Sequence, residues 1–330
     1  MKTHAFQLTQ VGGPDVLRLS GLDLRSPGPL EVRLRQEVVG FNFIDIAHRS
    51  GRYPLRLPSG IGMEAAGVVE EVGAEVTDLK IGDRVIYKMQ LGAYAEHRNV
   101  AAEQLVVIPP GLPTELAVAA FTKGLTAEFL LRRVHAVHPG ETLLVHAAAG
   151  GVGGFLTQWA KHLGAKVIGI VGNEEKVAIA QAQGCDAVIT AAPSELSRAV
   201  LDATDGRGVD VVYDSTGRDT FNASIDCLRP MGLFVSYGSA SGLIDPIDFS
   251  GLAARGAPFL TRVSIANYCA TRAELVAGAA QVFDLVLQGV VEPRISHRYR
   301  LEDAADCHAD AEARRHAGSV VLLTPHHSPA

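Results

Sequence analysis

The chain has 330 residues, enough for roughly two domains at about 150 residues each. Apolar residues make up 47% of it and charged residues 20%, which excludes a disordered chain. The formal net charge of −6 gives no overall positive field for nucleic acid or an anionic membrane. The composition therefore predicts a soluble protein with more than one domain.

The sequence shows no chelating cysteine cluster and no targeting segment. The four cysteines, at positions 185, 227, 269 and 307, are isolated from one another. No stretch reaches the 18 apolar residues of a membrane span, and the N-terminus lacks the apolar run of a secretion signal. We expect reduced thiols, no membrane association and a cytoplasmic location.

The first part of the chain, up to about Lys123, has the pattern of short strands separated by turns. These strands are expected in EVRLRQEVVG, EAAGVVEEVG, DRVIYK and YAEHRNV. From about Gly124 onward, apolar strands alternate with helical segments, which is typical of βαβ units and a parallel sheet. We therefore predict a β-rich domain and then an α/β domain with five or six parallel strands.

The clearest motif is a small-residue turn between a buried strand, TLLVH, and an amphipathic helix. The turn has the spacing AxGxxG over Ala148, Gly150 and Gly153, so alanine replaces the first glycine of the usual fingerprint. Small residues at these positions let the N–H groups of a helix N-terminus reach a pyrophosphate. The strand, turn and helix together predict dinucleotide binding.

The next strand ends without the acidic residue that holds the ribose 2′-hydroxyl of NAD. Gly172 stands there, and Lys176 follows as a cation that can pair with a 2′-phosphate. We therefore predict NADPH as the cofactor. The alternative is that Lys176 is an ordinary solvated residue and that Glu174 holds the ribose of NADH.

Several strings resemble those of the zinc-free quinone oxidoreductases, the zeta-crystallin-like family of the medium-chain dehydrogenase/reductase superfamily. They include GFNFIDIAHRSGRYP, LPSGIGMEAAGVVEEVG, KGLTAEFLL, VHAAAGGVGGFLTQWAK and VVYDSTGRDTF. Asn42 and Met63 stand where zinc alcohol dehydrogenases of this architecture carry Cys and His, and neither can replace a thiolate or imidazole ligand. The resemblance thus implies hydride transfer to a quinone without a metal site.

The resemblance also implies the architecture. A GroES-like catalytic domain comprises residues 1–123 and 265–330, and a Rossmann-type, doubly wound domain comprises residues 124–264. After Arg262 the sequence itself predicts a helix over about 272–289, a connection VEPRISHRYRL, a helix from Glu302 and a strand SVVLL.

Carried over residue by residue, the resemblance assigns a cofactor site. Asn42 contacts the nicotinamide together with Thr126, and Lys176 holds the 2′-phosphate. The pyrophosphate is held by Ala149, Gly150, Gly151 and Val152. The ends of the later strands contribute residues 215–217 and 237–239, among them Ser215, Gly217, Tyr237, Gly238 and Ser239. Arg262 and Arg314 match basic positions near the cofactor, although Arg314 can equally be a surface charge.

Two positions depart from the family pattern. Ala47 and Ala191 stand where relatives carry tyrosine near the nicotinamide and the adenosine phosphate. These changes imply weaker cofactor binding and a wider substrate pocket.

We predict an NADPH-dependent quinone reductase in which Asn42 and Tyr53 orient the acceptor and Arg262 helps to hold it against the nicotinamide. Hydride transfer depends mainly on positioning, so no general acid is assigned. One alternative is an NADPH-dependent enoyl or 2-alkenal reductase built on the same domains. Another is a non-catalytic NADPH-binding structural or RNA-binding protein, and the acidic charge argues against RNA.

Self-association is also expected. The strand GLFVSYGS is predicted to lie at the edge of the parallel sheet, where it can pair with its copy in a homodimer.

Overall fold

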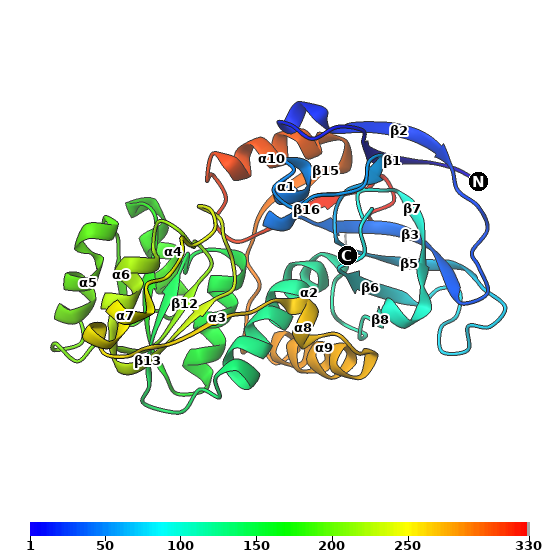
Figure 1. Cartoon of the computed structure of the whole chain (residues 1–330). Coiled ribbons are helices and arrows are strands. Elements are labelled where there is room, and N and C mark those ends of the chain that lie inside the picture. The colour runs from blue at the N-terminus through cyan, green and yellow to red at the C-terminus, as the bar shows by residue number, and fades with distance from the viewer. Residues whose placement is uncertain (329–330) are drawn as a thin grey trace. The chain divides into compact units, whose positions relative to one another are not determined.

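The computed structural model describes residues 1–328, and the chain divides into two units (Figure 1). Of the described residues, the first unit comprises 1–123, 271–288 and 293–328, and the second comprises 124–270 and 289–292. Residues 265–270 and 289–292, which were predicted to belong to the first domain, thus group with the second unit. The division after Lys123 falls inside helix α2 (Thr114–Phe129).

The second unit is built on six parallel strands in the order β11-β10-β9-β12-β13-β14, which confirms the predicted parallel sheet. The strands are β9 (Thr142–His146), β10 (Lys166–Ile170), β11 (Ala187–Ile189), β12 (Val209–Asp214), β13 (Leu228–Ser236) and β14 (Phe259–Arg262). The strand order reverses between β9 and β12. In open parallel sheets, ligands bind at the carboxyl ends of the strands beside such a reversal.

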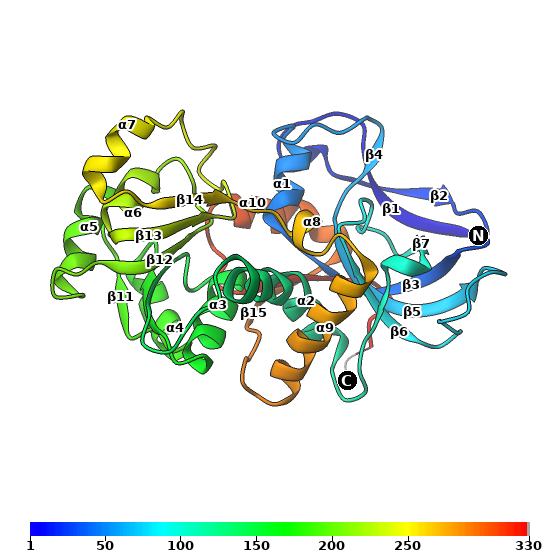
Figure 2. The same ribbon diagram turned by 60° about the horizontal axis from the view of Figure 1, so that its bottom comes forward.

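Helices cover both faces of this sheet (Figure 2). On one face, α5 (Pro193–Asp202) and α6 (Phe221–Asp226) contribute Leu196 and Phe221 to an apolar core with the strands. Helices α3 (Gly151–His162) and α4 (Val177–Ala182) connect strands that proceed toward the other edge, so right-handed crossovers place them on the opposite face. The shorter helices are η3 (Leu130–Val134), η4 (Glu174–Lys176), α7 (Phe249–Leu252), η5 (Ala253–Arg255) and α8 (Ile265–Tyr268).

The predicted edge strand is not at the edge. The first five residues of GLFVSYGS form the end of β13, which pairs with β12 on one side and with β14 on the other, so this prediction was wrong. Strand β14 is hard to recognise in the sequence, because it has four residues and only its central two are partly buried. The two edges of the sheet are therefore β14, next to β13, and β11 on the opposite side.

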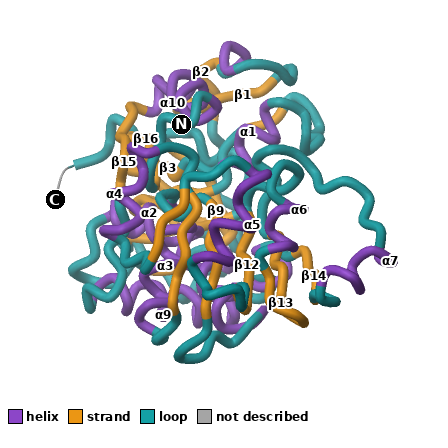
Figure 3. Tube along the Cα trace, turned by 90° about the vertical axis from the view of Figure 1, so that its left-hand side faces the viewer, coloured by secondary structure: helices purple, strands orange, loops and turns teal. Residues whose placement is uncertain are grey.

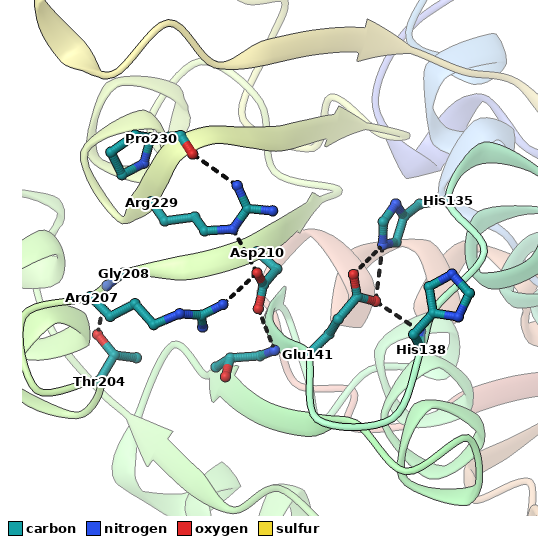
Figure 4. A network of polar contacts seen from close by, with 10 residues as sticks. His135, His138, Glu141, Thr204, Arg207, Gly208, Asp210, Arg229 and Pro230 are labelled. Carbon is teal, nitrogen blue, oxygen red and sulfur yellow. Dashed lines mark hydrogen bonds and ion pairs between the residues drawn. The ribbon is translucent and has the colours of Figure 1, made fainter.

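A buried carboxylate joins β9 to β12 at the amino ends of both strands (Figure 4). Asp210 accepts hydrogen bonds from Thr142 N at 2.8 Å, and from Arg207 Nη2 and Arg229 Nε at 2.6 Å each. Burial opposes ionisation of this carboxyl, but the three donors together hold the pKa of Asp210 below its ordinary value. The network fixes the end of the sheet that lies opposite the small-residue turn.

The first unit is organised on one long strand, β3 (Glu31–Gly40). One edge of β3 pairs with β5, and the other edge is shared: β7 pairs with residues 31–35 and β16 with residues 38–40. The partners in this seven-stranded sheet are β5 (Glu64–Val72), β6 (Arg84–Lys88), β7 (His97–Ala101), β8 (Val106–Val107), β15 (Ile295–Arg300) and β16 (Ser319–Leu323). The strands that follow the second unit in sequence thus return to this sheet, where β16 pairs with β3 and β15 pairs with β16 (Figure 3).

Besides the first part of α2, a smaller sheet and several further helices belong to the first unit. The sheet has the order β2-β1-β4, with β1 (Lys2–Leu8), β2 (Arg18–Asp23) and β4 (Ser59–Gly60). The helices are η1 (Pro14–Val16), α1 (Phe43–Arg49), η2 (Ala102–Gln104), α9 (Arg272–Leu287), η6 (Leu301–Asp303) and α10 (Ala304–Glu312). The expected connection VEPRISHRYRL contains β15, and the strand expected from YAEHRNV begins only at His97.

Within the described part of the chain, no helix combines the length and the apolar character needed to cross a membrane.

Candidate cofactor and substrate site

The turn between β9 and α3 requires residues without large side chains. A Cβ at Gly153 would lie 2.2 Å from the carbonyl oxygen of Ala147, and a Cβ at Gly150 would lie 3.0 Å from the same atom. Gly150 is the N-cap of α3, and no side chain caps the helix. The first N–H groups of α3 therefore lack intrahelical partners and, together with the helix dipole, form a site that attracts an anion.

The end of β10 has room for a further phosphate. A Cβ at Gly172 would meet no atom within 4 Å, and Lys176 ends the short helix η4 that follows. The carboxylate of Glu174 accepts a hydrogen bond from the Thr190 hydroxyl. The group that would hold the ribose of NADH in the alternative is therefore already bonded within the protein.

The carboxyl ends of β12, β13 and β14 lie in register at Asp214, Ser236 and Arg262. Arg262 Nη1 donates hydrogen bonds to Ser236 Oγ at 2.8 Å and to the Gly238 carbonyl. A Cβ at Gly238 would lie 2.3 Å from the carbonyl oxygen of Ser215, so the two loops touch through backbone. The structure thus brings together five sequence-predicted site positions, namely Ser215, Tyr237, Gly238, Ser239 and Arg262.

Asp214 shapes the loop that carries Gly217. Its carboxylate accepts hydrogen bonds from Thr216 N at 2.6 Å, from Gly217 N at 3.0 Å and from Thr220 Oγ1 at 2.6 Å. Asp214 was not among the predicted site residues, although a carboxylate at the end of a fully buried strand is a usable signal. We infer that Asp214 fixes the conformation of this loop, so that the loop backbone is exposed at the carboxyl ends of the strands.

In the first unit, Asn42 lies between β3 and α1. Its Nδ2 donates a hydrogen bond to Glu64 Oε2 at 2.9 Å, and its backbone N donates to Asp45 Oδ2 at 3.0 Å. An ionised carboxylate only accepts hydrogen bonds, so the amide of Asn42 must turn its NH2 group toward Glu64. The Oδ1 atom of Asn42 then faces the first turn of α1, where Asn42 and Asp45 cap each other reciprocally.

Glu64 is fully buried and surrounded by donors. Besides Asn42, it accepts hydrogen bonds from Thr122 N at 2.8 Å and from Lys123 Nζ at 2.9 Å, and Lys123 is itself buried. Neither Glu64 nor Lys123 was among the predicted site residues. The signal was present, because each is a lone charge in an apolar stretch, GMEAAG and AAFTKGL.

The other predicted residues are distributed between the units. Tyr53 is 36% exposed, with its backbone N bonded to Ala47 O at 3.0 Å, and Ala47 itself is buried in α1. Arg314 is an exposed residue of the first unit in the left-handed backbone region, with φ of 58°. Thr126 belongs to the second unit, on α2.

A buried polar chain lies behind Asn42. Tyr94 Oη donates to Asp45 Oδ2 at 3.1 Å and lies 3.0 Å from His308 Nε2. Burial raises the pKa of Asp45 to about 7, and burial lowers the pKa of His308 to about 3. Near neutral pH, the network behind Asn42 therefore holds a neutral imidazole and a carboxyl close to its titration point.

Two family models match the chain. An alcohol dehydrogenase GroES-like domain matches residues 28–139, and a zinc-binding dehydrogenase domain matches residues 151–275. The fold and the glycine turn define the chain as a member of the medium-chain dehydrogenase/reductase class.

Comparison with individual proteins identifies the family within this class. A quinone oxidoreductase of Pseudomonas aeruginosa is 45% identical over 96% of this chain and 98% of its own length. A 2-haloacrylate reductase of Burkholderia sp is 43% identical over 94% of this chain and 96% of its own. The Escherichia coli quinone oxidoreductase complexed with NADPH superposes with a TM-score of 0.94 at 40% identity, over 97% of this chain and 99% of that one. The chain belongs to the quinone oxidoreductase family.

The buried ion pair of Glu64 and Lys123 provides a test of how strongly the surroundings of Asn42 depend on a buried charge. We expect Glu64→Gln to lower the free energy of unfolding by about 3 kcal/mol, because it leaves the Lys123 ammonium buried without a counter-charge. The double variant Glu64→Gln/Lys123→Met should recover part of this loss. Urea unfolding of the wild type, both single variants and the double variant measures the coupling.

The pair formed by Lys161 and Asp186 serves as the control. These side chains are 34% and 42% exposed, so Lys161→Met should cost less than about 1 kcal/mol. The coupling of Glu64 and Lys123 is contradicted if the double variant loses as much unfolding free energy as the two single variants lose together.

The shifted groups behind Asn42 predict opposite pH dependences. Between about pH 4 and pH 7 the folded state binds more protons at Asp45 than the unfolded chain does, so Asp45 weakens the wild type as the pH rises. The stability of Asp45→Asn relative to the wild type should therefore grow over this range. His308 has a lowered folded pKa, so its contribution is lost as the pH falls from about 6.5 toward 3, and the relative stability of His308→Gln should grow on acidification.

Urea unfolding at three pH values between about 4 and 7 checks both trends. A relative stability that stays constant with pH in either variant shows that its buried group keeps its ordinary pKa.

Proposed function

We propose that the protein is an NADPH-dependent quinone reductase. The observation that carries the proposal is the β9–α3 turn, in which Ala147 and Gly153 approach so closely that only glycine fits. The turn leaves backbone N–H groups for a pyrophosphate, and relatives of 41% to 45% identity are named quinone oxidoreductases. The residues present therefore suit a phosphorylated dinucleotide.

NADPH is preferred to NADH in this proposal. Two solved relatives are complexed with NADPH, the Escherichia coli quinone oxidoreductase and a mycobacterial protein 41% identical to this chain. Lys176 supplies a positive charge for the 2′-phosphate, Gly172 leaves space for it, and Glu174 is engaged with Thr190. The pyrophosphate is assigned to the backbone of residues 149–152.

The chain's residues orient the reactants, and the bound cofactor supplies a hydride from C4 of its nicotinamide. We assign the nicotinamide side to Asn42, whose side chain is held in place by Glu64 and by the first turn of α1. Tyr53 and Arg262 are assigned to the acceptor and to the nicotinamide end of the sheet. Thr126 and Arg314 complete the cofactor contacts that we propose, and the catalytic step needs no metal at Asn42 or Met63.

A second acceptor class has a specific observation in its favour. The 2-haloacrylate reductase that is 43% identical to this chain is named for reducing an activated carbon–carbon double bond. The same hydride donor can serve a quinone or such an alkene, so the acceptor pocket decides between them.

The proposed location of the enzyme is the cytoplasm.

The cofactor and the acceptor are tested together. We expect the purified protein to oxidise NADPH faster than NADH, and to give a higher kcat/KM with quinones than with enones or 2-haloacrylate. Lys176→Ala should lower kcat/KM for NADPH by about 10- to 100-fold, the worth of one charge-assisted hydrogen bond, and leave the value for NADH unchanged. Steady-state kinetics over an acceptor panel measures this.

Lys166→Ala is the matched control, because Lys166 is an exposed lysine on β10 of the same unit. An equal loss with both cofactors in Lys176→Ala rejects the role of Lys176. Preference for 2-haloacrylate over every quinone selects the second acceptor class.

We also propose a homodimer formed through β14, the edge strand of the parallel sheet. Its first residue, Phe259, is 64% exposed, and Met231 at the neighbouring strand is 63% exposed. An open edge with apolar side chains can pair with its copy across a two-fold axis. Light scattering after size exclusion should show a dimer for the wild type and a monomer for Phe259→Asp.

Leu287→Asp should leave the dimer intact, since Leu287 is a similarly exposed apolar residue on α9 of the other unit. A monomeric wild type, or a dimeric Phe259→Asp, contradicts pairing through β14.

A further inference from the structure

A cluster of metal-binding side chains lies in the first unit, outside the positions assigned to cofactor and acceptor. Glu96, His97 and His326 each direct one ligand atom into a space where these atoms lie within 4.8 Å of one another. In the described part of the chain, this is the one group of three or more His, Cys, Asp or Glu side chains that meets this spacing. Two imidazoles and a carboxylate form a ligand set typical of zinc.

The cluster lies at the junction on β3 where two strands share one edge. His97 begins β7 and pairs with Arg35, while Thr324, just after β16, donates from Oγ1 to the Gln36 carbonyl at 2.6 Å. The rings of His97 and His326 meet here, with centroids 4.6 Å apart. The backbone of β3 therefore sets the positions of both histidines.

The N-terminal strand closes the third side. His4 Nδ1 lies 3.0 Å from Glu96 Oε2, and the Glu96 backbone N donates to the His4 carbonyl at 2.9 Å. Three chain segments far apart in sequence, around residues 4, 97 and 326, thus meet at one point. An ion held there would cross-link both ends of the described chain to the centre of the sheet.

The surroundings of His97 and His326 are those expected of metal ligands. Thr3 Oγ1 lies 3.2 Å from His97 Nδ1, which leaves His97 Nε2 as the nitrogen available to an ion. Metal-bound histidines usually have their second nitrogen fixed by such a partner. His326 Nε2 is buried and has no hydrogen-bond partner, which is costly for an imidazole unless another group engages it.

The local charge also suits a cation. Glu96 is 16% exposed and carries a negative charge toward the two imidazoles. Glu70 Oε2 lies 3.6 Å from His97 Nε2, and Arg35 Nε pairs with the other oxygen of Glu70 at 3.1 Å. Arg35 therefore offsets the charge of Glu70, whereas the partner of the Glu96 carboxylate is another histidine, His4.

We propose that Glu96, His97 and His326 bind one Zn²⁺ ion that joins the C-terminal segment to the sheet of the first unit. Ligand atoms around tetrahedral Zn²⁺ lie about 3.4 Å apart, so atoms within 4.8 Å of one another need to approach by at most about 1.4 Å. His4 or water completes the coordination. The role is structural, and it is separate from hydride transfer.

The experiment uses the full chain without an affinity tag, freed of metal by a chelator and titrated with ZnCl2 alone. Calorimetry should show one saturable site per chain, and bound Zn²⁺ should raise the Tm by about 2 to 4 °C. His326→Gln should weaken binding at least about 100-fold, and Thr3→Val about 10-fold, because it frees the second nitrogen of His97.

His327→Gln is the matched control. His327 is the adjacent residue, and its Nε2 lies 3.0 Å from Glu115 Oε1, outside the cluster. This variant should bind Zn²⁺ like the wild type. NADPH oxidation should be unaltered in every variant, which verifies folding, whereas the measured Zn²⁺ affinity does not depend on the proposed reaction.

Two results overturn the proposal. One is the absence of a saturable site in the wild type. The other is equal Zn²⁺ affinity in the wild type, His326→Gln and His327→Gln, which identifies chelation by surface histidines.

Discussion

The close approach of Gly153 to the carbonyl oxygen of Ala147 is the constraint on which the rest of the second unit depends. A Cβ at that glycine would lie 2.2 Å from the oxygen, so helix α3 can leave strand β9 at this angle only if residue 153 has no side chain. The angle sets where the helix N-terminus points, and the helix N-terminus is the anion site. At the other end of β9, the Asp210 network holds the strand to β12, so the turn projects from a fixed base.

The first unit depends on a different interaction, in which the buried carboxylate of Glu64 is stabilised by hydrogen-bond donors. Glu64 has no exposed surface, yet three donors surround it, from Asn42, Thr122 and Lys123. A carboxylate so placed is costly unless every lone pair finds a donor. Here the satisfaction of Glu64 also decides which way the Asn42 amide faces, so one buried charge both joins β5 to α2 and orients a candidate binding group.

The elements whose pattern repeats could be predicted from the sequence. Five of the six parallel strands, helix α3 and the returning strand β16 follow from apolar runs and helical periodicity, and all of them are present. Strands β14 and β15 were not predicted, because their burial pattern is weak: Phe259 is exposed and His297 and Arg298 face solvent. The edge position of GLFVSYGS was wrong for that reason.

The candidate site was predictable where backbone geometry dictates residue type. Gly150, Gly153 and Gly238 stand where a Cβ would crowd a carbonyl oxygen, and such requirements restrict the residue type in the sequence. The polar partners left a weaker mark. Asp214, Glu64 and Lys123 act through contacts that depend on the folded chain, and no local pattern encodes those contacts.

The sharing of β3 by two strands has a consequence for biosynthesis. The second unit consists almost wholly of one continuous stretch, residues 124–270, whereas the edge of β3 at residues 38–40 is completed only by β16, near residue 320. During synthesis on the ribosome, the parallel sheet can therefore fold while the N-terminal segment, which was synthesised earlier, still has an unpaired strand edge. The N-terminal segment is therefore synthesised first, but its sheet is completed last.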